Sequence, residues 1–178
     1  MKNIFIKHKL IHQNIIDDLT YDLQFEKEKL ATVSYKGKGS IQKEFRSAIV
    51  KTVNTKFYFD YCKIIENFCQ EFSPNNLAMS LVVKEIEYLK YGISDHFKKH
   101  SDVISKVNKR RFSTITMLSK TDNIKGGDLL LYDNNLYKYD VDLQIGETVV
   151  FYSDTIHEVT PITCGGREVL VSWVYDRI

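Results

Sequence analysis

Residues 147–176 read ETVVFYSDTIHEVTPITCGGREVLVSWVYD, and three runs within them alternate apolar with polar side chains. The runs cover residues 147–152, 155–160 and 167–175. Short alternating runs that are rich in β-branched and aromatic residues are typical of β-strands with one buried face. Gly165 and Gly166 lie between the last two runs, where they supply a turn. We therefore predict three short strands joined by tight connections.

The same pattern extends back to Leu81. Further runs of this kind cover residues 81–91, 112–118, 128–132 and 136–141. Turn-forming residues separate them, among them the pairs Gly126-Gly127 and Asn134-Asn135. Several short strands at this spacing favour a mainly β fold, either a sandwich or a small barrel.

The first half of the chain has a different, helical periodicity. Apolar residues recur at intervals of three and four within residues 14–25 and again within residues 58–72, which predicts two helices. Ser73-Pro74 ends the second of these helices. Residues 31–35 read as a short strand. We expect the helices to flank the β-rich part from outside.

Composition narrows the class of protein. With 178 residues, 43% of them hydrophobic and 27% charged, the chain is expected to form one folded domain over residues 1–178 and not a fibrous or disordered one. The formal charge of +2 is small for a nucleic-acid-binding protein, which makes that partner unfavoured. No apolar run approaches the roughly 20 residues that span a bilayer. No secretory signal is recognisable, so we expect a cytoplasmic location.

The cysteines point to a reducing compartment. Cys62, Cys69 and Cys164 form an odd set without the spacing of a metal finger. We predict that they are buried free thiols.

The most informative chemical pattern is His100-Ser101-Asp102 together with His157. In an extended segment, residues i and i+2 point to the same side, so His100 and Asp102 can hold one ion. His157 is the one histidine that follows them in the sequence. Two histidines and one carboxylate on one face of an ion leave coordination positions open, as in non-haem Fe(II) oxygenases. A structural zinc site would instead need four protein ligands.

Arg167 is the second chemical signal. It follows the Gly165-Gly166 turn and shares one face of its predicted strand with Val169, Val171 and Trp173. An arginine on the interior face of a barrel is costly unless an anion pairs with it. A dicarboxylate cosubstrate would satisfy the guanidinium through two parallel hydrogen bonds.

An ordered set of short motifs runs through the second half of the chain. It comprises Tyr91-Gly92, His100-x-Asp102, Gly126-Gly127-Asp128-Leu129, Gly146-Glu147, Phe151-Tyr152, His157-Glu158-Val159-x-Pro161-Ile162-Thr163, Gly166-Arg167 and Trp173. This set resembles the 2-oxoglutarate/Fe(II)-dependent dioxygenases, and most narrowly the prolyl 4-hydroxylase-like (PKHD-type) catalytic domain. The resemblance implies a double-stranded β-helix (a jelly roll, cupin-like) over residues 81–176. Residues 1–80 would form a helical and mixed support.

The resemblance also implies roles for individual residues. His100, Asp102 and His157 would be the metal ligands and the catalytic centre. Arg167 would bind the far carboxylate of 2-oxoglutarate, and Tyr91 would contact the same cosubstrate. The implied cofactors are Fe(II), 2-oxoglutarate and O2, and the family also allows L-ascorbate.

Two residues depart from the pattern of prolyl hydroxylases. Phe97 and Met117 stand where members of that group carry tyrosines. Both departures leave the expected iron chemistry intact, but they weaken the prolyl assignment.

The expected function is hydroxylation of a protein or peptide side chain, with prolyl as the first candidate and succinate and CO2 as co-products. A small-molecule hydroxylase of the same chemistry remains an alternative, as does a cupin-like module that binds metal without turnover. A nucleic-acid demethylase is disfavoured, because Trp173 occupies the position of that group's second arginine. The sequence leaves the substrate and the oligomeric state open.

Overall fold

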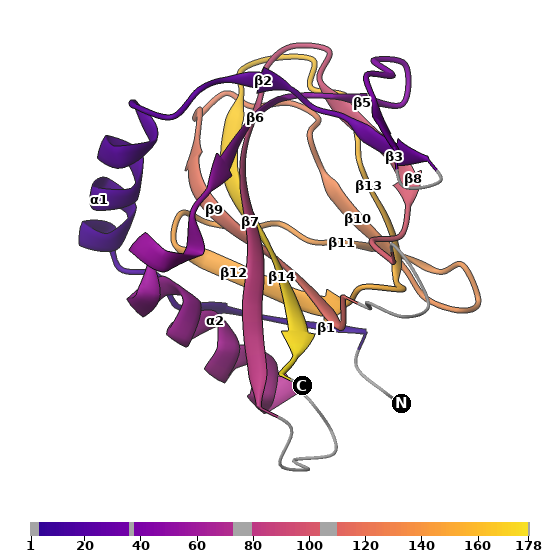
Figure 1. Ribbon diagram of the computed structural model, residues 1–178. Helices are drawn as coiled ribbons and strands as arrows, with labels where there is room; N and C mark the ends of the chain where they lie inside the picture. The colour runs from indigo at the N-terminus through magenta and orange to yellow at the C-terminus, as the bar shows by residue number, and fades with distance from the viewer. Residues whose placement is uncertain (1–3, 36–37, 73–79, 104–109, 178) are drawn as a thin grey trace.

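Two antiparallel β-sheets face each other in the computed structural model, which describes residues 4–35, 38–72, 80–103 and 110–177 (Figure 1). The helices are α1 (Gln13–Leu23), the short 3-10 helix η1 (Thr55–Phe57) and α2 (Phe59–Phe72). The strands are β1 (Phe5–Lys9), β2 (Lys29–Leu30), β3 (Val33–Tyr35), β4 (Lys38–Ser40), β5 (Arg46–Ser47), β6 (Ile49–Val53), β7 (Leu81–Tyr91), β8 (His96–His100), β9 (Phe112–Lys120), β10 (Leu129–Tyr132), β11 (Lys138–Asp140), β12 (Glu147–Tyr152), β13 (Ile156–Val159) and β14 (Arg167–Asp176).

The larger sheet has seven strands in the order β1-β12-β9-β14-β7-β6-β2. Its centre is β14, whose two neighbours β7 and β9 lie far from it in the sequence. The register places Arg167 of β14 opposite Tyr91 of β7 on one side and opposite Lys120 of β9 on the other. The turn before β14 thus brings Arg167 beside the end of β7.

The smaller sheet has five strands in the order β11-β10-β13-β8-β5. Its central pairing joins β13 to β8, with His157 directly opposite His100. A register irregularity follows between His157 and Val159. Two of the three predicted metal ligands are therefore cross-strand neighbours.

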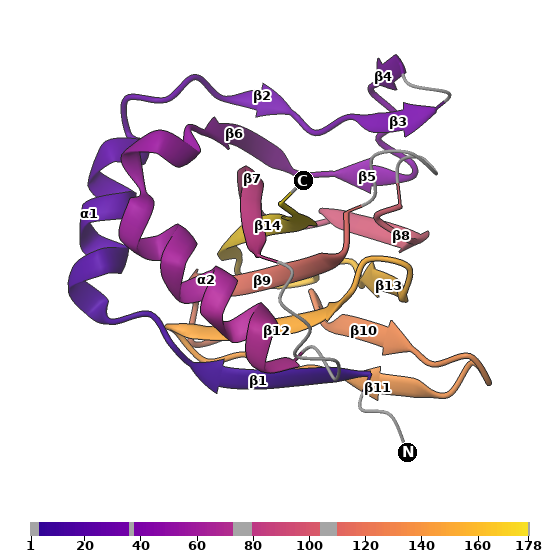
Figure 2. The same ribbon diagram turned by 60° about the horizontal axis from the view of Figure 1, so that its bottom comes forward.

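The hydrophobic core has two layers. Between the sheets lie the inward side chains of alternating strand residues, such as Leu131, Phe151 and Val169. On the outer face of the larger sheet, the intervening residues pack against α1 and α2, as Phe112 and Leu170 do. Figure 2 shows both helices on the side of the larger sheet that faces away from β8, β10 and β13. The alternation of apolar residues thus produces two buried faces on one sheet.

The mainly β jelly-roll fold with flanking helices is confirmed. The expected helices at 14–25 and 58–72 correspond to α1 and α2. All seven strands expected after Leu81 are present, with shifted ends. Of the run at 31–35, only β3 is a strand.

The sequence-based assignment missed several short strands. Residues before Leu81 supply β1, β2 and β6 to the larger sheet and β5 to the smaller one. Strand β8 was also missed, because its sequence HFKKH lacks an apolar face of its own. The N-terminal part of the chain therefore takes part in both sheets, in addition to providing the two helices.

The expectation of buried free thiols holds for two of the three cysteines. Cys62 and Cys69 are buried free thiols on α2, whereas Cys164 is a free thiol that is only half-buried. Among the described residues, no helix combines the length and apolar character needed to cross a membrane.

Candidate metal centre and anion-binding cavity

His100, Asp102 and His157 meet between the two sheets. His100 is the last residue of β8, and its pairing with β13 fixes His157 opposite it. Asp102 lies two residues beyond the strand, where its backbone N–H donates to the Ser153 carbonyl at 2.8 Å. The backbone of both segments thus directs three side chains to one point.

The three side chains are close enough to bind one ion. One ligand atom from each lies within 4.8 Å of the others. His100 Nε2 is 3.6 Å from Asp102 Oδ1, and His157 Nε2 is 3.7 Å from Asp102 Oδ2. Separations of this size suit donors around a metal at about 2.0–2.3 Å. Two imidazoles and a carboxylate are also the donor set of mononuclear Fe(II) oxygenase sites.

Hydrogen bonds to the backbone fix the orientation of both imidazoles. His100 Nδ1 is 2.7 Å from the Lys98 carbonyl, and His157 Nδ1 is 2.9 Å from the Thr155 carbonyl. A carbonyl oxygen can only accept, so Nδ1 carries the proton in each ring and Nε2 presents its lone pair to the centre. Burial, together with the neighbouring His157, lowers the pKa of His100 to about 3. His100 is therefore neutral and available as a ligand.

Asp102 is held as a carboxylate. Its Oδ2 atom accepts hydrogen bonds from Ser113 Oγ at 2.6 Å and from Trp173 Nε1 at 2.9 Å. Burial alone would raise the pKa of Asp102, but the neighbouring His157 and His100 and these two donors outweigh it and lower the pKa. Asp102 therefore contributes one negative charge that can balance a cation.

Aromatic rings enclose the two histidines. The Phe97 ring stacks on His100 with a centroid distance of 3.4 Å, and Phe151 meets His157 edge-on at 4.9 Å. Arg46 from β5 also lies over the Phe97 ring, with its guanidinium carbon 4.7 Å from the ring centroid. Phe97, one of the two departures from the prolyl hydroxylase pattern, thus packs directly against a candidate ligand.

Arg167 is buried at the edge of a cavity of about 200 Å³. Its Nε atom is buried and has no hydrogen-bond partner among the described residues. Burial lowers the pKa of Arg167, while Tyr91 and Asp128 act in the opposite direction. Asp128 lines the same cavity, but its carboxylate accepts a hydrogen bond from Thr160 Oγ1 at 2.9 Å. The guanidinium is thus placed to receive an anion that enters the cavity.

Tyr91, the other residue predicted to contact the cosubstrate, lies beside Arg167. The Tyr91 ring is buried under the guanidinium, with 5.3 Å between the Arg167 Cζ atom and the ring centroid. Burial raises the pKa of Tyr91, so its phenol is neutral. Met117, the second departure, is buried and lines the cavity with Arg167. The Met117 thioether makes this part of the cavity wall apolar, where a tyrosine would offer a hydrogen bond.

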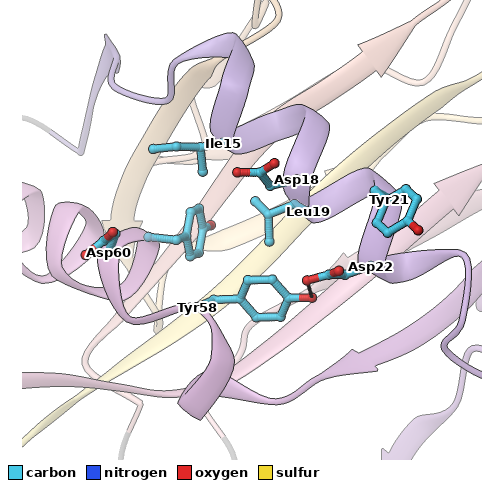
Figure 3. Close-up of a pocket in the computed structure, with 8 residues that line it drawn as sticks. Ile15, Asp18, Leu19, Tyr21, Asp22, Tyr58 and Asp60 are labelled. Atoms are coloured by element: carbon cyan, nitrogen blue, oxygen red, sulfur yellow. Dashed lines mark hydrogen bonds between the residues drawn. The ribbon is translucent and has the colours of Figure 1, made fainter.

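A larger cavity, of about 360 Å³, lies elsewhere in the molecule. Figure 3 draws the residues that line it. The cavity lies between α1 and the start of α2, and the side chains of Asp18, Asp22 and Tyr58 line it. Tyr58 donates a hydrogen bond to Asp22 Oδ2 at 3.3 Å. These helices pack on the outer face of the larger sheet, so this cavity is separate from the candidate metal centre.

Sequence reasoning missed the partners of Asp102. Ser113 and Ser153 are fully buried and hydrogen-bond each other at 2.9 Å beside the carboxylate. Trp173 was expected only to share a strand face with Arg167, yet its indole N–H reaches Asp102. A signal for Ser113 existed, because a serine inside an apolar strand must find a polar partner. The sequence could not indicate which partner it finds.

The jelly-roll fold and the His-Asp-His cluster define the class of non-haem Fe(II) oxygenases. The sequence model of the 2OG-Fe(II) oxygenase superfamily matches residues 86–175. The chain belongs to this superfamily. Membership implies Fe(II), 2-oxoglutarate and O2 as the cofactor set.

Two bacterial hydroxylases are similar to this chain in sequence. A PKHD-type hydroxylase of Acinetobacter baumannii is 39% identical over 66 residues, which cover 37% of this chain and 29% of the relative. A PKHD-type hydroxylase of Maricaulis maris is 30% identical over 106 residues, which cover 59% of this chain and 45% of the relative. The chain thus matches less than half the length of either relative.

Solved structures show the same fold. A Pseudomonas putida prolyl-4-hydroxylase superposes with a TM-score of 0.74 at 16% identity and covers 98% of this chain and 94% of its own. The viral collagen prolyl hydroxylase from Paramecium bursaria Chlorella virus-1, solved with 2OG, gives a TM-score of 0.70 at 12% identity. That match covers 98% of this chain and 97% of the viral chain. At these identities the likeness shows the fold.

Proposed function

We propose that this chain is an Fe(II)- and 2-oxoglutarate-dependent dioxygenase that hydroxylates a protein or peptide side chain. A prolyl residue is the first candidate target, and succinate and CO2 are the co-products. One observation carries the proposal: a cluster of two histidines and one carboxylate and a buried arginine that lines a cavity occur in the same fold. The first suits Fe(II), and the second suits a dicarboxylate.

Each residue has a defined task in this proposal. His100 and His157 offer Nε2, and Asp102 offers a carboxylate oxygen, so the metal would be held on one face. Arg167 binds the distal carboxylate of 2-oxoglutarate, and the ring of the neutral Tyr91 packs against the guanidinium. Bound iron supplies the oxidation chemistry, in which one atom of O2 enters the substrate and the other enters succinate. Phe97, Phe151 and Met117 make the surroundings apolar and exclude water.

The support for a prolyl target comes from the names of similar proteins. The names of the similar proteins include PKHD-type hydroxylases and prolyl hydroxylases. A Trichoplax adhaerens prolyl hydroxylase of the same fold was solved with a peptide fragment of hypoxia inducible factor. Phe97 and Met117 depart from the prolyl hydroxylase pattern. Hydroxylation of other side chains and of small molecules must therefore be tested beside hydroxylation of proline.

Turnover should be measured directly. The Fe(II) protein is incubated in air with 2-oxoglutarate and a panel of proline-containing peptides, other peptides and metabolites, each with and without L-ascorbate. Mass spectrometry records succinate and the gain of one oxygen atom by the substrate. We expect metal-dependent succinate formation that a true substrate increases.

Two histidine variants make this test specific. His157→Ala should abolish succinate formation, because it removes a ligand from the cluster. His12→Ala is the matched control, since His12 is exposed and precedes α1. Metal binding without any succinate would contradict the proposal and favour a binding module. Oxygen gain only by a metabolite would replace the peptide substrate with a small molecule.

A further inference from the structure

Arg46 is a second buried arginine, and the proposed function gives it no task. It lies in β5 of the smaller sheet, and 8% of its surface is exposed. Like Arg167, it has an Nε atom without a hydrogen-bond partner among the described residues. A buried guanidinium is costly unless its surroundings compensate the charge. The contacts that compensate Arg46 therefore indicate its role.

These contacts hold the Arg46 guanidinium between the two sheets. Strand β5 in the smaller sheet and β6 in the larger sheet have only Ala48 between them, so the chain crosses between the sheets here (Figure 2). Arg46 Nη2 donates to Glu87 Oε2 of β7 at 3.1 Å, in an ion pair. Its Nη1 atom donates to the Thr32 carbonyl at 3.0 Å. Two hydrogen bonds to separate segments therefore fix the position of the guanidinium.

From this position the side chain reaches the ring that packs on His100. Strand register pairs Arg46 with Phe97 of β8, and the guanidinium carbon lies 4.7 Å from the Phe97 centroid. This distance suits a cation–π contact. The Phe45 ring also meets Phe97, edge-on at 5.9 Å. The Phe97 ring in turn stacks on the His100 imidazole, with 3.4 Å between centroids and 18° between planes.

The backbone of the same segment reaches His100 by a second route. The Lys98 N–H donates to the Phe45 carbonyl at 2.9 Å. The Lys98 carbonyl lies 2.7 Å from His100 Nδ1 and accepts the hydrogen bond that directs Nε2 to the centre. Residues 45 and 46 thus act on both the plane of the imidazole and its Nδ1 hydrogen bond.

We propose that Arg46 is a positioning residue that holds Phe97 against the His100 imidazole and so directs His100 Nε2 toward the metal. The assignment rests on the proposed function, because it concerns the same metal site. A histidine ring can turn over a broad range about its Cβ–Cγ bond, so a free His100 would meet the ion in many orientations. Residues 1–80, which were expected to form a support, thereby contribute a side chain that orients a metal ligand.

Arginine variants with a matched control test the assignment. Arg46→Met removes the charge and the donors but keeps a long side chain, whereas Arg46→Lys keeps the charge and loses the planar fork. Arg111→Met is the control, because Arg111 also forms an ion pair, at 2.7 Å with Asp176, and also lies over a phenylalanine ring, that of Phe112. Phe112 packs edge-on against Phe72 of α2, on the outer face of the larger sheet.

A double-mutant cycle tests whether Arg46 acts through Phe97. Phe97→Leu removes the ring, and Arg46→Met is measured with and without it. If Arg46 acts through the ring, it should have little further effect once the ring is gone.

Three measurements are made on each protein. Co(II) titration, followed by the visible absorption spectrum, gives metal affinity and coordination. A ¹H–¹⁵N NMR spectrum of the histidine side chains, recorded without metal, reports which ring nitrogen of His100 carries the proton. Urea unfolding without metal gives stability.

We expect Arg46→Met to weaken Co(II) binding by roughly 10- to 100-fold, as for other groups that orient metal ligands. Its Co(II) spectrum should change, and His100 should change from one tautomer to a mixture. Arg46→Lys should lie between this variant and the wild type. Arg111→Met should keep the wild-type affinity, spectrum and tautomer.

Three results would overturn the assignment. Unchanged affinity and tautomer in Arg46→Met would show that Arg46 does not orient His100. An equal loss from Arg46→Met with and without Phe97 would show that the ring is not the link. An equal loss in Arg111→Met would show a general effect of removing an ion pair. If Arg46→Met does not fold, Arg46→Lys takes its place in the cycle, and wild-type behaviour of that variant would refute the assignment.

The proposed function fails in a different way. Absence of Co(II) binding by the wild-type protein would refute the proposed metal site. The tautomer of His100 in the metal-free protein would still show whether Arg46 orients the ring, so the two failures are distinguishable.

Discussion

Arg167 is a buried residue whose surroundings favour an anionic ligand. Its guanidinium is buried, its Nε has no partner among the described residues, and Asp128 nearby is engaged by Thr160. Tyr91 and Asp128 offset the effect of burial on the Arg167 charge only in part, and a buried charge without a hydrogen-bonded partner is costly. The cavity beside it can admit an anion that removes this cost. Arg167 therefore offers the most direct test of the cosubstrate site.

Arg167→Ala should weaken 2-oxoglutarate binding by roughly 30- to 1000-fold, which is about 2–4 kcal/mol. Fe(II) binding should stay nearly intact, because the metal cluster lies on other strands. Arg167→Lys should restore part of the affinity, since the charge remains while the paired hydrogen bonds are lost. Anaerobic titration of the Fe(II) protein, followed by its visible charge-transfer band, measures both effects. Equal affinity in the alanine variant would show that Arg167 is structural.

Gly126 is a residue whose backbone conformation excludes a side chain. It has φ +71°, and a Cβ atom there would lie 2.1 Å from the Pro161 carbonyl oxygen. Gly126→Ala should therefore lower the free energy of unfolding by about 2 kcal/mol or more. Gly92→Ala is the control, since the nearest atom to its Cβ would be 3.8 Å away. Urea denaturation compares the two, and equal stability would contradict the steric argument.

At the level of elements, α2 is anchored to the larger sheet by a polar contact inside an apolar interface. Tyr61 is buried on α2, and its hydroxyl lies 3.1 Å from Thr116 Oγ1 and 3.0 Å from Ser172 Oγ. Thr116 also bonds Thr148 at 2.8 Å. These groups connect the helix to three strands of one sheet, which specifies where along the sheet α2 lies.

Tyr61→Phe should lower the free energy of unfolding by about 1–2 kcal/mol, because two buried hydroxyls lose a partner. Tyr58→Phe, which removes a longer hydrogen bond to the exposed Asp22, should change stability by less than about 0.5 kcal/mol. Chemical denaturation of both variants measures the difference. A Tyr61→Phe variant as stable as the wild type would mean that the interface depends on apolar packing alone.

At the level of the whole molecule, the two halves of the chain share one core. Strand β6 pairs with β7, and β1 pairs with β12, so N-terminal strands extend both sides of the larger sheet. The cluster under α1 and α2 takes residues from both halves, such as Leu19 and Leu170. The boundary between residues 1–80 and 81–176 is a prediction made from sequence patterns. Whether residues 81–176 can fold without residues 1–80 can be tested.

The isolated fragment 81–176 should not fold on its own. Without α1 and α2, the outer face of the larger sheet would expose its apolar side chains, and edge strands would be unpaired. We expect no cooperative thermal transition for the fragment, whereas the full chain shows one. Circular dichroism and one-dimensional NMR measure this. A fragment with a cooperative transition and dispersed amide signals would show that residues 81–176 form an independent domain.

Much of the candidate site was predictable because its signals are local. His100 and Asp102 are two residues apart, so strand geometry alone brings them to one side. Their meeting with His157 was inferred and is seen in the structure. The contacts that restrain Asp102 were not predictable, because they join residues 11 and 71 positions apart. No local sequence pattern around Ser113 or Trp173 indicates that Asp102 is the acceptor of its hydrogen bond.

The sequence by itself determined the positions of most strands and helices, since apolar periodicity is a property of neighbouring residues. It also predicted the donor set and an anion at Arg167, which stay predictions. The tertiary structure alone decided that β13 pairs with β8, which sets His157 opposite His100, and that β1, β5 and β6 join the sheets. Strand register depends on packing between segments far apart in the chain, and a short polar strand such as β8 forms only when neighbours pair with it.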